Sequence, residues 1–150
     1  MSETKTCLTE AMLLEETYKN VRMGSDSIIN LTSRVKNEAL RSEMMAQLDH
    51  YEDFAHRAAR SLCDLGEKPK EESAMSRVSV KLGMAMNTMT DSTTSHLAEM
   101  LIQGSVMGVT DLMKQISAAE ECGVTGNALD LAREVVKFEE EGAERFKPFL

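Results

Sequence analysis

Apolar side chains recur every three or four residues along most of the chain, which is the spacing of one face of an α-helix. The first run predicts a helix from about Cys7 to Val35. The second run follows a short polar turn at Lys36 and Asn37 and stops before Gly66, a residue that commonly ends helices. These two runs therefore predict two long amphipathic helices joined by a short turn.

The pattern changes after the polar turn around Pro69. Residues Met75–Met89 predict a short amphipathic helix, and the polar stretch Thr88–Ser95 follows it, with Asp91 as the expected N-cap of a new helix. One long helix with a polar middle is the alternative interpretation. The stretch His96–Ile116 is apolar on most of its sides, so we expect protein to surround it.

The last helix is predicted from about Ala128 to Pro148, after a glycine-containing loop. Several glycines lie inside predicted helices, where glycine costs roughly 1 kcal/mol relative to alanine, and three of them bear on the packing. Gly24 predicts a kink or a close helix approach in the first helix. Gly104 and Gly108 are one turn apart, which predicts that a neighbouring backbone approaches the third long helix there.

These elements predict an all-α protein: a single domain over residues 1–150 that forms a four-helix bundle, with a short extra helix between the second and third main helices. The composition agrees with this prediction. The chain has no Trp, only two Pro, and twelve Met residues. Such a composition favours helices over strands.

The charge of the chain argues against two classes of partner. Its 25 acidic and 17 basic side chains give a net charge of −8, which disfavours binding to nucleic acid or to a membrane surface. No apolar run is long enough to cross a membrane, and the opening residues do not resemble an export signal. The three cysteines are widely spaced and indicate reduced thiols, so we expect a cytoplasmic protein.

The chain contains none of the familiar nucleotide-binding or hydrolase motifs. The candidate chemistry lies in a few polar residues near the predicted inner faces. His96 and Glu99 are three residues apart on the third main helix, Glu52 and His56 are four apart on the second, and Glu139 lies close to the inner face of the last. We treat these five residues as the candidate metal ligands.

Carboxylates and histidines that project into a four-helix bundle build di-iron and di-manganese centres. Iron or manganese would therefore be the ion, although the Glu-x-x-His spacing typical of such centres is absent and we expect no cofactor. The competing interpretation makes His96 and Glu99 a buried hydrogen-bonded pair. It also places Glu52 and His56 on a solvated flank.

Several strings resemble bacterial ferritin-like proteins of uncharacterised function. The residues that carry the resemblance are 86–91 (MNTMTD) and 95–104 (SHLAEMLIQG), followed by Met107 and Gly108, and it covers roughly residues 10–147. The resemblance implies a ferritin-like four-helix bundle, and many members of such families hold a di-iron centre that oxidises or stores iron. Glu99 matches a ligand position on the third helix.

Three functions compete at this point. The first and favoured hypothesis is a non-catalytic ferritin-like bundle with a degenerate metal site, which forms homo-oligomers or binds a protein partner. The second is an atypical di-iron or di-manganese oxidoreductase or iron-handling protein that uses the five candidate ligands. The third is a sensor that holds a small ligand in the Met-rich interior of the bundle.

Overall fold

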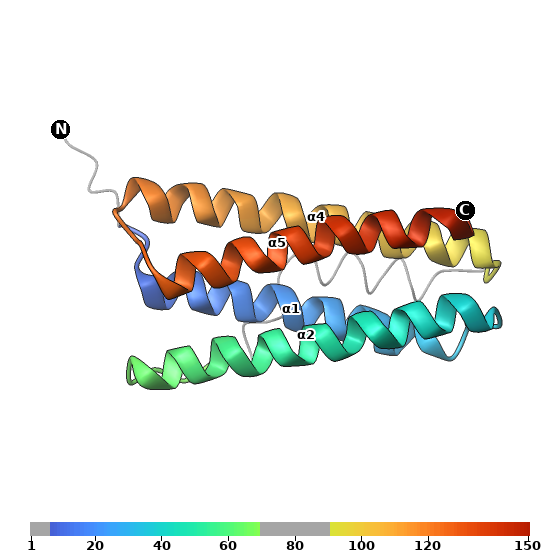
Figure 1. The fold of residues 1–150 in the computed structure, drawn as a ribbon, viewed down its shortest axis with the longest axis horizontal. Helices are drawn as coiled ribbons and strands as arrows, with labels where there is room; N and C mark the ends of the chain where they lie inside the picture. The colour runs from blue at the N-terminus through green and yellow to red at the C-terminus, as the bar shows by residue number, and fades with distance from the viewer. Residues whose placement is uncertain (1–6, 70–90) are drawn as a thin grey trace.

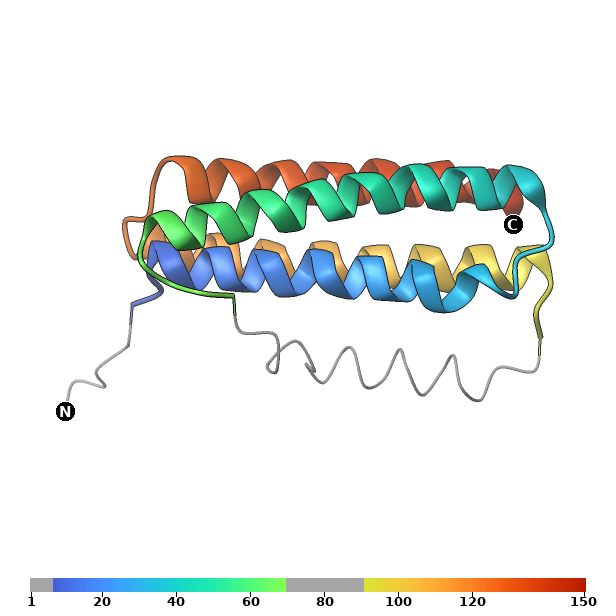
Figure 2. The same cartoon turned by 90° about the horizontal axis from the view of Figure 1, so that it is seen from below.

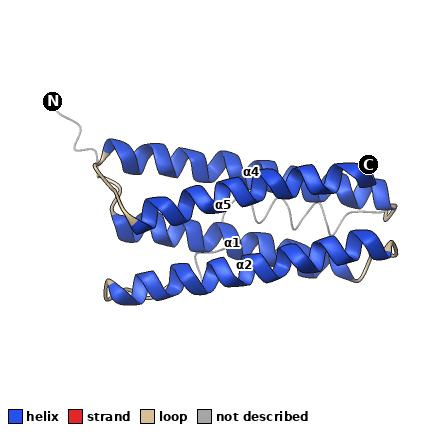
Figure 3. Cartoon of the chain, in the orientation of Figure 1, coloured by secondary structure: helices blue, strands red, loops and turns tan. Residues whose placement is uncertain are grey.

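The computed structural model describes residues 7–69 and 91–150 of the chain, and these residues form four α-helices and no strand (Figures 1 and 3). The helices are α1 (Glu10–Thr32), α2 (Glu38–Asp64), α4 (Thr94–Glu121) and α5 (Asn127–Phe146), and a short 3₁₀ turn, η2 (Lys147–Phe149), follows α5. The predicted all-α class and the four main helices are confirmed. The short helix predicted over Met75–Met89 lies outside the described residues.

Capping side chains set where the helices begin. The Thr9 hydroxyl accepts a hydrogen bond from the backbone N–H of Met12, and the N-terminus of α1 is therefore Glu10 rather than Cys7. Asn37 caps α2 in the same way, by accepting from the backbone N–H of Leu40 at 2.9 Å. The polar turn predicted at Lys36 and Asn37 thus supplies the cap of the second helix.

Gly66 ends α2 as predicted. Its φ of 77° lies in the left-handed region that favours glycine. Its backbone N–H donates to the Cys63 carbonyl, and the N–H of Glu67 donates to the Leu62 carbonyl. These two bonds satisfy the last carbonyls of the helix in the manner of a Schellman motif.

Thr93, not Asp91, is the N-cap of α4. The Thr93 hydroxyl accepts from the backbone N–H of His96, while the Asp91 carboxylate accepts from the backbone N–H of Thr93 at 2.9 Å. The prediction of Asp91 as the cap is therefore wrong by two residues, because the Asp91 side chain holds the capping residue instead. Since the backbone at Thr93 is extended, a new helix does begin there, in agreement with the favoured interpretation of this region.

The four helices form two antiparallel hairpins. Helix α1 turns directly into α2, and α4 turns directly into α5 (Figures 1 and 2). Helix α2 ends at one end of the bundle and α4 begins at the other. Helix α1 packs against α2 and α4, and α5 packs against the same two helices, each pair antiparallel, while α1 and α5 run parallel and also contact each other.

The hydrophobic core lies between the hairpins, and leucine is its most frequent residue, while Tyr51 and Phe54 of α2 pack against Phe138 of α5. Its largest fully buried side chains include Leu14, Leu62, Leu112 and Phe146, one from each helix. Burying a side chain of this size stabilises the fold by about 1.5–3 kcal/mol. None of the helices formed by the described residues has the combination of length and apolar content that spanning a bilayer requires.

Helix α4 departs from the prediction that protein surrounds it. Val106 is 52% exposed and Met113 is 51% exposed, whereas Leu101 and Leu112 face the core. Among the described helices, mainly α1 and α5 pack against α4, and these exposed side chains lie outside those contacts. An apolar surface of α4 is therefore left facing solvent.

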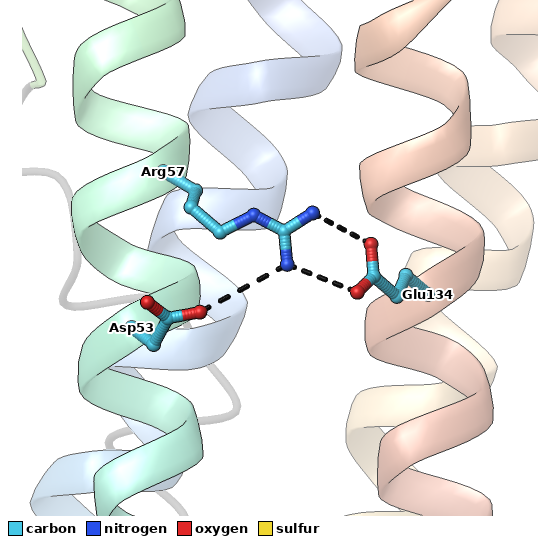
Figure 4. A network of polar contacts seen from close by, with 3 residues as sticks. All are labelled: Asp53, Arg57 and Glu134. Carbon is cyan, nitrogen blue, oxygen red and sulfur yellow. Dashed lines mark hydrogen bonds and ion pairs between the residues drawn. The ribbon is translucent and has the colours of Figure 1, made fainter.

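A surface network ties α2 to α5 (Figure 4). The Arg57 guanidinium donates two hydrogen bonds to the Glu134 carboxylate, at 2.9 and 2.7 Å, and lies 3.9 Å from the Asp53 carboxylate. The bonds to Arg57 lower the pKa of Glu134, and those to Glu134 raise the pKa of Arg57. Because the paired groups are partly exposed, this ion pair contributes little to the free energy of unfolding. It links one position of α2 to one position of α5.

Gly24 lies where α2 approaches α1 closely, which agrees with the approach predicted from its position. A Cβ placed at Gly24 would lie 2.5 Å from the Tyr51 ring, a distance that side chains essentially never show. Tyr51 is buried and its ring is rigid, so the ring has little room to move away. Glycine is needed at position 24 because any side chain there would overlap the Tyr51 ring.

We therefore expect Gly24→Ala to lower the free energy of unfolding. Overpacking against the Tyr51 ring costs about 1–3 kcal/mol, and the higher helix propensity of alanine returns only about 1 kcal/mol. Urea unfolding followed by circular dichroism measures the difference. Asn30→Ala, at an exposed position of the same helix, is the matched control and should not destabilise the protein; equal stability of both variants would refute the clash.

Candidate functional site

His96 and Glu99 lie on the surface, near the beginning of α4. The His96 Nδ1 atom is 3.7 Å from a Glu99 carboxylate oxygen, and the two side chains are 35% and 56% exposed. Gln103 continues this row by donating to Glu99 at 3.4 Å. The three residues thus share a face as predicted, but the interpretation of His96 and Glu99 as a buried pair is wrong, because Leu97 and Ala98 occupy the inner face of this turn.

Glu52 and His56 lie on the outer part of α2. Glu52 is 3.9 Å from the Arg22 guanidinium of α1, and both side chains are partly exposed. His56 is exposed to solvent. The prediction of a solvated flank at these two residues is confirmed.

Glu139 is the one candidate that points into the bundle, with 3% of its surface exposed. Its neighbour across the interior is Tyr51 of α2, whose hydroxyl donates to a Glu139 carboxylate oxygen at 3.4 Å. Ser105 of α4 is buried near the same Tyr51 hydroxyl, and its own hydroxyl donates to the Leu101 carbonyl at 3.0 Å. Three helices thus contribute to one buried polar group of side chains.

The fourth helix contributes Asn20. Its side-chain amide donates to the backbone carbonyl of Gly108 at 2.9 Å, across the α1–α4 interface. Asn20 is 4% exposed. This bond fixes the amide so that its nitrogen faces Gly108, which determines where its oxygen lies.

Gln47 completes the group and connects it to the surface. Its amide nitrogen donates to the Glu43 carboxylate at 2.9 Å and to the Gly142 carbonyl at 3.3 Å. Glu43 in turn accepts from Arg145 of α5 at 2.8 Å. An ion pair at the surface therefore holds a buried amide in place. We call Asn20, Gln47, Tyr51, Ser105 and Glu139 the central polar layer.

Glycines make room for three members of the central polar layer. Tyr51 lies against Gly24, as described above. A Cβ at Gly108 would lie 2.8 Å from a Glu139 carboxylate oxygen, and a Cβ at Gly142 would lie 2.9 Å from the Gln47 oxygen. The close approach predicted at Gly108 is therefore made by a side chain, Glu139, and not by a neighbouring backbone.

Two oxygens of the central polar layer have no hydrogen-bond donor. They are Asn20 Oδ1 and Glu139 Oε2, and both are buried. Asn20 and Glu139 line the same cavity, whose volume is about 30 Å³. The rest of its wall is partly apolar and includes Met100 and Leu101. This volume is far below the roughly 300–1,000 Å³ of sites for drug-sized ligands, so only a very small ligand fits.

Burial controls the charge state of this layer. It raises the pKa of Glu139 well above its ordinary value, the Tyr51 hydrogen bond opposes that rise, and the charge of Asp111 adds to it. Burial also raises the pKa of the Tyr51 hydroxyl, and the nearby Glu139 charge raises it further. Both groups therefore favour their neutral forms.

The central polar layer does not fit a di-iron or di-manganese centre. Such centres use four carboxylates and two histidines projecting inward, whereas this layer has one carboxylate and no histidine. His96 is twelve residues from Gly108 along α4, or about 18 Å at 1.5 Å per residue, so it lies too far from Glu139 to share an ion. Among the described residues, no three His, Cys, Asp or Glu side chains are placed to hold a metal ion.

The sequence pointed to one member of the layer and missed four. Glu139 was found because it lies between Phe138 and Gly142, next to the inner face. The missed residues are uncharged. An uncharged polar residue on the inner face of a predicted helix does not by itself indicate a binding site. The available signal was the set of mid-helix glycines, each of which faces a polar side chain of another helix.

Comparisons with known proteins add no family to these observations: no family model, curated protein or solved structure matches the chain.

The raised pKa of Glu139 predicts a specific pH dependence. A group whose folded pKa exceeds its unfolded pKa stabilises the protein below the unfolded value, and that stabilisation is lost as the pH rises through the folded value. We therefore expect the wild-type protein to lose stability relative to Glu139→Gln as the pH rises from about 4.5. Between the two pKa values the loss is about 1.4 kcal/mol per pH unit.

Urea unfolding of both proteins between pH 4 and pH 9 at constant ionic strength measures this difference. The matched control is Glu140→Gln, which removes the same charge one residue further along α5, at an exposed position. Its stability should follow the wild type across the whole range. Parallel profiles for the wild type and Glu139→Gln would show that Glu139 is not a buried titrating group.

Proposed function

We propose that this chain is a ferritin-like four-helix bundle that is not catalytic and that acts by binding a second copy of itself. The connections between the helices support the ferritin-like part of the proposal. Two antiparallel hairpins joined by one long crossover is the arrangement of ferritin-like folds, and α1–α2 and α4–α5 are connected in this way (Figure 2).

The central polar layer supports the non-catalytic part. It lies in the interior of the bundle, where ferritin-like proteins carry their di-metal ligands. Here α1 supplies Asn20, α2 supplies Gln47 and Tyr51, and α4 supplies Ser105. Neutral side chains at these places correspond to a degenerate metal site, with Glu139 as its single carboxylate.

The observation that carries the proposal is the exposed apolar surface of α4. Ile102, Val106, Val109 and Met113 follow one another at spacings of four, three and four residues, as the contact residues of a helix pair do. Val106 and Met113 are about half exposed. We call these four residues the α4 stripe.

Charge is missing from this part of α4. The eleven residues 100–110 (MLIQGSVMGVT) contain no charged side chain, in a chain of which 28% is charged. Beside the stripe lies a groove of about 520 Å³ between α4 and α5, and its α5 side is charged, because four of its lining residues are glutamates and one is Lys147. Few charges at the centre and an apolar contact surface are characteristic of protein interfaces.

The stripe is self-complementary, which favours a second copy of the chain as the partner. Its spacing reads the same in both directions, so an antiparallel copy of α4 places Ile102 opposite the partner's Met113 and Val106 opposite the partner's Val109. Two-fold interfaces require this kind of self-match. A homodimer through α4 also covers the surface that the other described helices leave open.

We expect the wild-type protein to be a dimer at micromolar concentration and Val106→Glu to be a monomer, because a buried unpaired carboxylate is costly at an interface. Sedimentation velocity measures the state of each. The matched control is Ile29→Glu on α1, where the replaced side chain is 53% exposed and the charge change is the same. It should remain dimeric.

Two outcomes would contradict the proposed dimer. A monomeric wild-type protein at tens of micromolar would show that the α4 stripe does not join two copies. A dimer that survives in Val106→Glu would place the interface elsewhere. Circular dichroism of each variant confirms that the helices are intact.

Elemental analysis tests the degenerate site. We expect purified protein, expressed with iron and manganese supplied and without chelator, to contain well under one ion of either metal per chain. One carboxylate and neutral oxygens supply too little negative charge for two divalent ions. About two ions per chain would reverse this proposal in favour of an iron-handling or oxidoreductase function, and Glu139→Ala would then be the first variant to examine.

A further inference from the structure

Asn20 Oδ1 and Glu139 Oε2 are buried acceptors without a donor, although such groups in folded proteins nearly always have one. Both side chains are held in place by their other atoms. The Asn20 nitrogen donates to Gly108, and the other Glu139 oxygen accepts from Tyr51. These bonds restrict the rotation of both side chains, and both residues line the same interior cavity.

That region is a cavity of about 30 Å³, lined by Asn20 and Glu139. A water molecule needs roughly 10–15 Å³ of such volume, so the cavity holds one or two particles of that size. Gly108 makes room for the Glu139 carboxylate at the cavity wall, because a Cβ there would lie 2.8 Å from Glu139 Oε2.

The cavity has no basic group. No Lys, Arg or His is among the described residues that line it, and Glu139 is its only acidic member. Burial and the nearby charge of Asp111 make Glu139 favour its neutral form in the empty cavity. A cation bound there would supply the missing positive charge and favour the carboxylate.

We propose that the central polar layer binds one monovalent cation of about the size of a water molecule, held by Asn20 Oδ1 and the Glu139 carboxylate. The hydroxyls of Ser105 and Tyr51 lie in the same layer and offer further oxygen ligands. Hard oxygen donors suit sodium, potassium and ammonium, and one carboxylate balances one unit of charge. A divalent ion would leave a net positive charge buried.

Half-buried residues of the cavity wall show a route to this site. They are Met23 and Ser27 of α1 and Met107 of α4. Because α1 and α4 pack against each other, these residues form a part of the cavity wall that solvent partly reaches. The cation is therefore expected to exchange without unfolding of the bundle.

Thermal unfolding in different chloride salts tests the site. The wild-type protein is titrated with sodium, potassium, ammonium or magnesium chloride, while choline chloride, whose cation is too large for the cavity, keeps the ionic strength constant. We expect the melting temperature to rise and saturate with at least one of the three monovalent ions. At ten times the dissociation constant the rise is about 3–6 °C for a protein of this size.

Two variants locate the effect. Glu139→Gln removes the negative charge that would balance the cation and keeps the size of the side chain. Its amide can donate to Asn20 Oδ1, so we expect the variant to fold. We expect its melting temperature not to rise with the monovalent salts. Glu140→Gln removes the exposed carboxylate of the next residue, and its melting temperature should rise with the monovalent salts as much as that of the wild type.

The proposal is overturned if the wild-type melting temperature is the same in choline as in all three monovalent salts, a result that needs no variant. It is also overturned if the rise persists in Glu139→Gln, which would place the ion elsewhere. A response to magnesium alone would assign the site to divalent ions instead.

Discussion

The carboxyl group of Glu139 lies in the middle of the bundle against the backbone of Gly108, and its burial constrains each helix around it. A carboxyl group in such a place needs a polar neighbour, which Tyr51 provides from α2 by donating to it. It also needs space, which the missing side chain of Gly108 provides. Removing either kind of support would leave a buried polar group unsatisfied, at a cost of about 1–3 kcal/mol.

The central polar layer also explains why glycine occurs inside helices of an otherwise good helical sequence. At Gly24, Gly108 and Gly142 a side chain from another helix occupies the position that a Cβ would take. Each glycine destabilises its own helix by roughly 1 kcal/mol relative to alanine, so the three together substantially lower the local stability of the helices. An apolar layer of alanine and leucine would avoid this loss of stability. The glycines and the polar side chains that they face are therefore better explained by the ion that we propose the layer binds than by the stability of the bundle.

The sequence predicted the helices well because each long helix carries an apolar stripe with the helical period, and Gly66 ends α2 where the pattern placed the end. The orientation of the polar residues was harder to predict. On α4, His96 and Glu99 share one face, but several faces of that helix are apolar, so the period alone does not show which one is inside. Contacts between helices decide this, and the contact of Gly108 with Glu139 joins residues 31 positions apart.

The same ambiguity on α4 leads to a physical conclusion about the whole molecule. A helix without a charge over residues 100–110 is expected inside a protein, yet Val106 faces solvent in the single chain. The inward-facing residues of this stretch carry no charge because they lie in the hydrophobic core or beside the central polar layer. Nothing within the described bundle accounts for the outward-facing ones, because they lie outside the contacts of α4 with α1 and α5. An apolar outer face at Ile102, Val106 and Val109 is thus a property that the single chain does not require and that a second copy explains.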